Sequence, residues 1–209
     1  MGVNKEDIME TKRFLEKVAS DSPTPGGGSV SALAGALSAS LVAMVAGLSS
    51  KRDKKCQKEM GEIKKKALGI QRRLFLAIDE DADSFNEVIK AFRLPQKTER
   101  DRLSRIRAIQ KAYQKATVTP QLVCQQSIQL LECSRLLILK GNPNAVSDMG
   151  VAAFLADAAL AGGLLNIGIN LVPVTDKVFL KRMRSLMTDW AKKRNHLMGE
   201  ILISLTKIG

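Results

Sequence analysis

Aromatic residues are scarce in this chain. Phe, Trp and Tyr make up 4% of its 209 residues, whereas hydrophobic residues as a whole make up 45%. The core must therefore be built from Leu, Ile, Val, Met and Ala, which suits packed helices better than sheets. A disordered chain is excluded, because disordered segments are poorer in apolar residues. Strand-like alternation of apolar and polar residues is also nearly absent.

Cysteine and histidine are too few to build a zinc site. Cys56, Cys124 and Cys133 form no CxxC pair, and His196 is the one histidine. We therefore expect no metal and no cofactor, and His196, which lies among lysine and arginine residues, is expected at the surface. Sparse cysteine is typical of a reducing compartment. The first residues lack the apolar core of a signal peptide, so we expect a cytoplasmic protein.

Acidic residues are in the minority, and the formal net charge is +12. Residues 51–73 contain ten Lys/Arg against three acids, and residues 90–115 contain nine against two. Such runs are either solvated helix faces or sites that attract an anion. A nucleic-acid-binding helical protein is the remote alternative. We expect no nucleic acid, because the first run has no aromatic residue to stack on bases and no known binding module is evident.

Helical periodicity runs through most of the chain. It predicts helices over about 5–19, 53–92 and 98–140, the last kinked or divided by Pro120, and a final helix capped by Thr175. Two further helices, about 30–48 and 149–171, are rich in Gly and Ala and almost free of charge. A helix that is apolar on all sides is buried. We predict one all-α domain over residues 1–209, a single helical bundle with two buried Gly/Ala-rich helices.

The segment 30–48 is long enough to cross a bilayer, so a membrane protein is the third class considered. Its serines and small residues, and the charged amphipathic helices elsewhere in the chain, favour a core helix instead. We therefore expect no membrane partner. Small residues recur every fourth position, a row that lets another helix approach closely. They are Ser31, Gly35, Ala39, Ala43 and Gly47.

A glycine loop precedes the first apolar helix. Gly26, Gly27 and Gly28 form a tight turn or an anion-binding helix start, because backbone N–H groups there point outward. Ser29 is a plausible N-cap. The loop is neither a P-loop nor a dinucleotide fingerprint, because no Gly-Lys-[Ser/Thr] follows and no strand precedes it.

Asp81 interrupts an apolar helix seam. The seam passes through Ile70, Leu74 and Ala77, and its next position is Asp81. Burial would raise the pKa of this carboxyl and keep it available as an acid. The neighbouring Asp79 and Asp83 are interpreted as solvated.

Asp148 follows a loop that contains Asn142 and Asn144. It is either a helix cap or a carboxylate held ionised by a helix N-terminus. Asn166 and Asn170 lie four residues apart on the apolar helix that follows. Buried amides need partners, so each either pairs with another helix or holds a polar ligand.

Three segments, in chain order, resemble the formiminotetrahydrofolate cyclodeaminase / methenyltetrahydrofolate cyclohydrolase family. They are Phe14-Leu15 through Leu37, Glu80–Phe85 with Leu94-Pro95, and Gly141–Asp148 with Asn166–Leu171. The resemblance implies an all-helical fold, a homodimer, a folate substrate, and no metal or redox cofactor. Its members either close 5-formiminotetrahydrofolate to 5,10-methenyltetrahydrofolate with loss of ammonia, or hydrolyse the methenyl form to 10-formyltetrahydrofolate.

We expect the cyclodeaminase reaction, with the cyclohydrolase reaction as the alternative. The absence of the formiminotransferase domain that some members carry favours the alternative. Our hypothesis makes Asp81 the acid/base, while Asp148 orients or pairs with the cationic carbon. Other residues are expected to bind a polyglutamylated substrate. Asn166 and Asn170 would bind the pterin or the loop opposite, and Lys51 and Lys54 would attract the glutamate tail. The remaining substrate-binding residues are Pro25, Gly26, Gly27, Gly28 and Ser29, which would form a pocket wall, together with Asn142 and Asn144.

Overall fold

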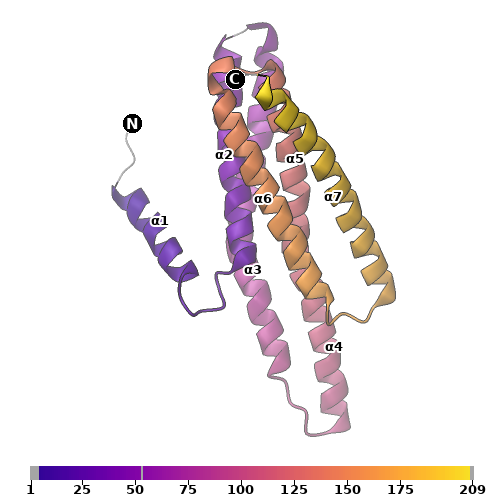
Figure 1. The fold of residues 1–209 in the computed structure, drawn as a ribbon. Coiled ribbons are helices and arrows are strands. Elements are labelled where there is room, and N and C mark those ends of the chain that lie inside the picture. Colours follow the sequence, from indigo (N-terminus) through magenta and orange to yellow (C-terminus); the bar gives the residue numbers. More distant parts are fainter. Residues whose placement is uncertain (1–4, 53, 208–209) are drawn as a thin grey trace.

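The computed structural model of this chain describes residues 5–52 and 54–207, without the side chains of residues 5–9 and 54. Over these residues it contains helices and no strand (Figure 1). The elements are α1 (Lys5–Val18), α2 (Gly27–Arg52), the short 3-10 helix η1 (Lys54–Cys56), α3 (Gln57–Phe92), α4 (Glu99–Ala116), α5 (Val118–Lys140), the 3-10 helix η2 (Pro143–Ala145), α6 (Val146–Leu171) and α7 (Lys177–Thr206). The predicted all-helical bundle is confirmed.

The long helices run side by side along the bundle. Helix α2 packs against α3, α5 and α6, and α5 packs against α6 and α7. The end of α3 and helix α4 extend beyond the bundle as a hairpin, while α1 stands to one side of it (Figure 1). One core therefore serves the whole bundle, with α2 at its centre.

The row of small residues on α2 lets its neighbours come close, as predicted. A Cβ added to Gly35 would lie 2.8 Å from the Leu74 side chain of α3 and 3.5 Å from Ala159 of α6. The buried Ser38 hydroxyl donates a hydrogen bond of 2.7 Å to the Ala152 carbonyl of α6. Close approach of this kind maximises dispersion contacts between helices that have few large side chains.

Helices α2 and α6 are buried on one side only, so the prediction of full burial needs correction. Leu165 is 75% exposed and Val172 is 77% exposed. By length and composition alone, α2 and the segment Pro143–Leu171 would suffice to cross a membrane, although 56% of the most apolar part of α2 is buried inside the bundle. A contiguous exposed apolar face of this kind is typical of an interaction surface.

The helix ends follow local chemistry. Thr98 caps α4, accepting a hydrogen bond from the Asp101 N–H at 3.1 Å, and Gly141 is the C-cap of α5. The N-cap of α7 is Asp176 and not Thr175 as predicted, because the Asp176 carboxylate accepts the N–H groups of Val178 and Phe179. The chain divides at Thr117, three residues before Pro120, which lies in the first turn of α5 where a proline is tolerated.

Candidate functional site

A cavity of about 480 Å³ lies at the end of the bundle where α2 begins. Its size is within the range of ligand pockets for organic molecules. The glycine loop, α3, α4 and the end of α6 all contribute to its wall. The lining residues are Pro23, Thr24, Gly26, Gly27, Gly28, Asp81, Ser84, Phe85, Val88, Tyr113, Ala116, Asn166, Ile169, Asn170, Val172 and Pro173.

Asp81 is the carboxyl group of this wall. The Ser29 hydroxyl lies 3.4 Å from Asp81 Oδ2 and donates to the Ile78 carbonyl at 2.8 Å. Burial raises the pKa of Asp81, and hydrogen bonds from the Ser29 backbone and hydroxyl offset part of that rise. The net effect is that Asp81 retains its proton to a higher pH than an ordinary aspartate.

Gly28 makes room for the Asp81 carboxylate. A Cβ at Gly28 would collide with both carboxylate oxygens and with Cγ of Asp81. The carboxylate therefore sits against the first turn of α2, where unpaired N–H groups and the helix dipole favour negative charge. This packing explains the need for glycine at position 28.

Two residues expected to wall the pocket lie outside it. Ser29 is not the N-cap, because α2 already begins at Gly27, and its side chain is fully buried. It therefore lies behind Asp81, to which its hydroxyl is hydrogen-bonded, and does not line the cavity. Pro25 lines a neighbouring hollow together with Phe14 and Asp79.

Asn166 and Asn170 both line the cavity. The Asn166 amide donates to the Gly162 carbonyl of its own helix at 2.8 Å. The Asn170 amide donates to the Ala116 carbonyl at 2.9 Å and so ties α6 to the end of α4. Both amide nitrogens are thereby oriented, and no hydrogen bond to either Oδ1 is found within residues 5–52 and 54–207. These oxygens can accept hydrogen bonds from a ligand.

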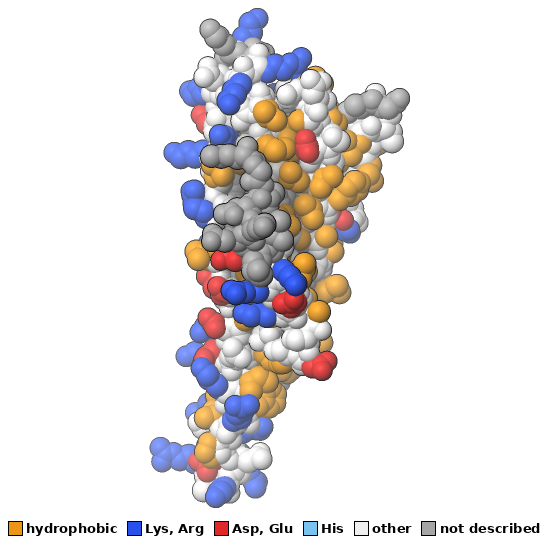
Figure 2. Space-filling view, turned by 90° about the vertical axis from the view of Figure 1, so that its left-hand side faces the viewer, with side chains coloured by type: hydrophobic (Ala, Val, Ile, Leu, Met, Phe, Trp, Pro, Cys, Tyr) orange, Lys and Arg blue, Asp and Glu red, His pale blue; other side chains and the backbone are white. Residues whose placement is uncertain are grey.

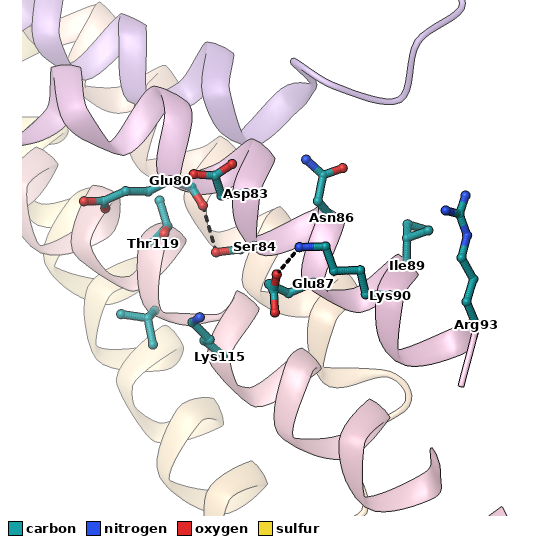
Figure 3. Close-up of a pocket in the computed structure, with 11 residues that line it drawn as sticks. Glu80, Asp83, Ser84, Asn86, Glu87, Ile89, Lys90, Arg93, Lys115 and Thr119 are labelled. Atoms are coloured by element: carbon teal, nitrogen blue, oxygen red, sulfur yellow. Dashed lines mark hydrogen bonds and ion pairs between the residues drawn. The ribbon is translucent and has the colours of Figure 1, made fainter. Parts of the chain in front are cut away.

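A second hollow of about 820 Å³ lies beside the first and shares Ser84 with it. Figure 3 shows its charged side chains, with Lys90 turned toward Glu87 at 2.8 Å. Glu80, also on this hollow, pairs with Arg73 at 2.9 Å. Two of its three carboxylates, Glu80 and Glu87, are thus paired with cations. Because Asp81 does not line this hollow, we assign the chemistry to the smaller cavity.

The remaining predicted residues gather at the opposite end of the bundle. The Asn142 side chain accepts the Asn144 N–H at 3.1 Å, and the Asn142 N–H donates to Ser49 of α2 at 2.8 Å. Lys51 is exposed in the last turn of α2, and the Lys54 side chain lies outside the described residues. A hollow of about 330 Å³ opens there, lined by Ser49, Arg52, Cys56, Lys140, Gly141 and Asn142.

Asp148 belongs to this second end. It lies in the first turn of α6, whose N-cap is Ala145 without a side-chain capping bond. Eighteen residues separate it from Asn166, which at about 1.5 Å per residue corresponds to about 27 Å. The prediction that Asp81 and Asp148 flank one carbon is therefore wrong within a single chain, because α6 runs the length of the bundle.

Tyr113 and Phe85 are cavity residues that sequence reasoning missed. Tyr113 lies in a helix whose obvious pattern is positive charge, and its role depends on how α4 packs. The available signal was its rarity, since it is the only tyrosine. Both rings offer a flat apolar surface to a planar ligand.

The other titratable groups give no competing centre. His196 is exposed and lies 3.5 Å from Glu200, which confirms the surface position expected for it. Among the residues that the structure describes, no group of three or more His, Cys, Asp or Glu side chains could hold a metal ion. The cavity at Asp81 is thus the candidate active site.

The chain is similar in sequence and in fold to known proteins. The model of the family described as formiminotransferase-cyclodeaminase matches residues 10–189. A methenyltetrahydrofolate cyclohydrolase of Methylorubrum extorquens is 33% identical over 182 residues, covering 84% of this chain and 88% of that protein. The formimidoyltransferase-cyclodeaminase of Rattus norvegicus is 30% identical; the match covers 93% of this chain but only 36% of the rat protein. A crystal structure of formiminotetrahydrofolate cyclodeaminase from Thermotoga maritima superposes with a TM-score of 0.84 at 25% identity, covering 99% of this chain and 97% of that one.

Proposed function

This chain belongs to the formiminotransferase-cyclodeaminase family, and we propose that it acts on the one-carbon unit held between N5 and N10 of tetrahydrofolate. The observation that carries the proposal is Asp81, a half-buried carboxyl with a raised pKa on the wall of a cavity of about 480 Å³. Such a group can exchange a proton with a bound substrate at neutral pH.

The two reactions of the family share one carbon centre. In hydrolysis, water attacks the methenyl carbon, the bond from that carbon to N5 breaks, and N5 takes up a proton. In cyclodeamination, N10 attacks the formimino carbon, and the departing nitrogen is protonated and leaves as ammonia. Both routes place positive charge on the carbon between N5 and N10. A fixed carboxylate beside it stabilises that charge and moves the proton.

We propose that the chain hydrolyses methenyltetrahydrofolate, in preference to the cyclodeamination expected from the sequence. The Methylorubrum extorquens protein, which this chain matches over 88% of its length, is named a cyclohydrolase. Cyclodeamination is the second candidate, because the Thermotoga maritima protein of the same fold and extent is named a cyclodeaminase.

The cavity residues divide the work of binding. Asn166 and Asn170 accept N–H groups of the pterin, and the rings of Phe85 and Tyr113 cover its face. Gly26, Gly27 and Gly28 form the wall against which the substrate lies. No step requires a metal or redox cofactor, so turnover should survive prolonged dialysis against a chelator.

Purified protein supplied separately with each substrate tests the proposal. Absorbance of the methenyl chromophore falls if the chain hydrolyses methenyltetrahydrofolate and rises if it cyclises the formimino form. We expect the fall. A rise alone would make the chain a cyclodeaminase, and no enzymatic change with either substrate would overturn the proposed function.

A further inference from the structure

The aromatic floor of the cavity continues beyond it onto the hairpin of α3 and α4. Tyr113, which lines the cavity, meets the ring of Phe92 edge to face, with the ring centroids 6.2 Å apart. Phe92 is the last residue of α3 and is 43% exposed. Figure 2 shows hydrophobic side chains on this protruding lower part of the molecule, with lysine and arginine side chains beside them. A ligand bound at Asp81 can therefore extend over an apolar surface outside the cavity.

Arg105 of α4 is held over Phe92 by two contacts. Its Nε donates a hydrogen bond of 3.1 Å to the Phe92 carbonyl, and its Cζ lies 5.5 Å from the centre of the Phe92 ring. Within residues 5–52 and 54–207, its Nη groups donate no hydrogen bond and form no ion pair with a carboxylate. The guanidinium is therefore fixed in place while the outer part of its fork, which matches a carboxylate, stays open.

The cavity itself holds no cation that could bind an acidic substrate. Its lining, in the part of the chain that the structure describes, contains no lysine or arginine, and Asp81 is its charged residue. The substrate proposed above carries two carboxylates at the end of a p-aminobenzoyl-glutamate arm, and this arm begins at N10. Carboxylates enclosed beside Asp81 would repel it and lack a partner. The end of the arm is therefore expected outside the cavity, at a cation.

The spacing of the three side chains fits this arm. The step from the Tyr113 ring to the Phe92 ring is 6.2 Å, and the step from the Phe92 ring to the Arg105 guanidinium is 5.5 Å. In the substrate a benzene ring and an amide, placed in line, separate N10 from the α-carbon of the glutamate, and ordinary bond lengths make this separation comparable. With the reacting carbon beside Asp81, the glutamate can reach Arg105.

We propose that Arg105 binds a carboxylate of the first glutamate of the substrate, and that Phe92 packs against the aminobenzoyl ring. The identity of the substrate rests on the proposed function. Both residues lie away from the reacting carbon, so they determine specificity and do not take part in the chemical step. They recognise the part that monoglutamyl and polyglutamyl substrates share, and glutamates added to the tail extend beyond this contact.

A pair of substrates with and without the glutamate tests the proposal. The first is the form that the wild type turns over, as its monoglutamate. The second is its methylamide analogue, in which a methyl group replaces the glutamate beyond the amide nitrogen. The wild type should show a KM about tenfold lower for the monoglutamate, because a hydrogen-bonded charge pair is lost with the analogue. Arg105→Ala should raise the KM for the monoglutamate about tenfold and leave that for the analogue unchanged, with kcat unaltered.

Two further variants separate recognition from support of the hairpin. Arg107→Ala is the matched control, because it removes an arginine from an exposed position of the same helix, and both KM values should stay at the wild-type level. Arg105→Lys keeps the charge but not the planar fork, so its KM for the monoglutamate should lie between those of wild type and Arg105→Ala. If Arg105→Ala changed kcat, or raised KM equally for both substrates, its role would be structural and the proposal would be overturned.

Phe92→Leu gives a different expected pattern. The aminobenzoyl ring is present in both substrates, so loss of the aromatic contact should raise both KM values about threefold. Unchanged KM values would overturn the assignment of Phe92. A wild type with the same KM for the monoglutamate and the analogue would overturn the role of Arg105 and leave the proposed function intact. Absence of turnover with any of these compounds would instead overturn the proposed function, and the inference with it.

Discussion

The two ends of the bundle carry carboxylates in opposite situations. Asp81 is enclosed at the start of α2, is hydrogen-bonded by Ser29, and has a raised pKa. Asp148 lies half-buried in the first turn of α6 without a capping bond. The first carboxyl lies on the wall of the cavity, whereas the second lies at a helix N-terminus away from it.

Loss of the Asp81 carboxyl should have the largest effect. Asp81→Asn keeps the shape of the side chain but removes the proton carrier, and we expect kcat to fall by about 10³-fold. Steady-state kinetics measure the fall, with folate binding and circular dichroism unchanged. Asp79→Asn, an exposed carboxyl on the same helix, should leave kcat unaltered. An Asp81→Asn enzyme within threefold of wild type would contradict the assignment.

Gly28→Ala should disturb the same end through geometry alone. The new Cβ would occupy the place of the Asp81 carboxylate and push it from the first turn of α2. A misplaced catalytic group costs on the order of 10²-fold in kcat. Gly69→Ala is the matched control, because nothing lies within 4 Å of a Cβ there. That variant should keep full activity and gain about 0.5–1 kcal/mol of stability, because alanine favours a helix.

Lys51→Ala should have a milder effect, which is to weaken the binding of a polyglutamate tail. Removing one exposed cation lowers the attraction for a polyglutamate tail, and we expect KM for the polyglutamylated substrate to rise about fivefold with kcat unchanged. The monoglutamate form should respond less, and the difference should shrink at high salt. Lys65→Ala on the outer side of α3 provides the control. Equal effects of both substitutions would show that only net charge matters.

Local patterns in the sequence predicted the helices, the start of a helix at about residue 98 and the burial of Asp81. Each of these depends on residues within one or two turns of a helix, so periodicity and end signals suffice. The seam through Leu74 and Ala77 placed Asp81 correctly because the seam continues to the cavity.

The errors concern relations between helices. No local pattern says that Asp148 and Asn166 lie at opposite ends of α6, or that Ser29 turns inward to Ile78. Tyr113 reaches the cavity only because the end of α4 packs beside α6, a contact of residues far apart in the chain. Helices α2 and α6 were predicted to be fully buried because an uncharged surface looks the same in sequence whether it packs inside the bundle or is exposed.

The smallest expected effect is on the free energy of unfolding, which reports the burial of Asp81 separately from its role in catalysis. Its folded-state pKa is raised above the ordinary value of 3.8, so its contribution to stability is present below pH 3.8 and is lost as pH rises through the folded-state pKa. At neutral pH the buried charge is unfavourable, and Asp81→Asn should be about 1 kcal/mol more stable than wild type. Urea unfolding at pH 3 and at pH 8 should show the advantage growing as the pH rises above 3.8, while Asp79→Asn stays level with wild type. A less stable Asp81→Asn protein at pH 8 would mean that the hydrogen bonds from Ser29, and not burial, dominate the site.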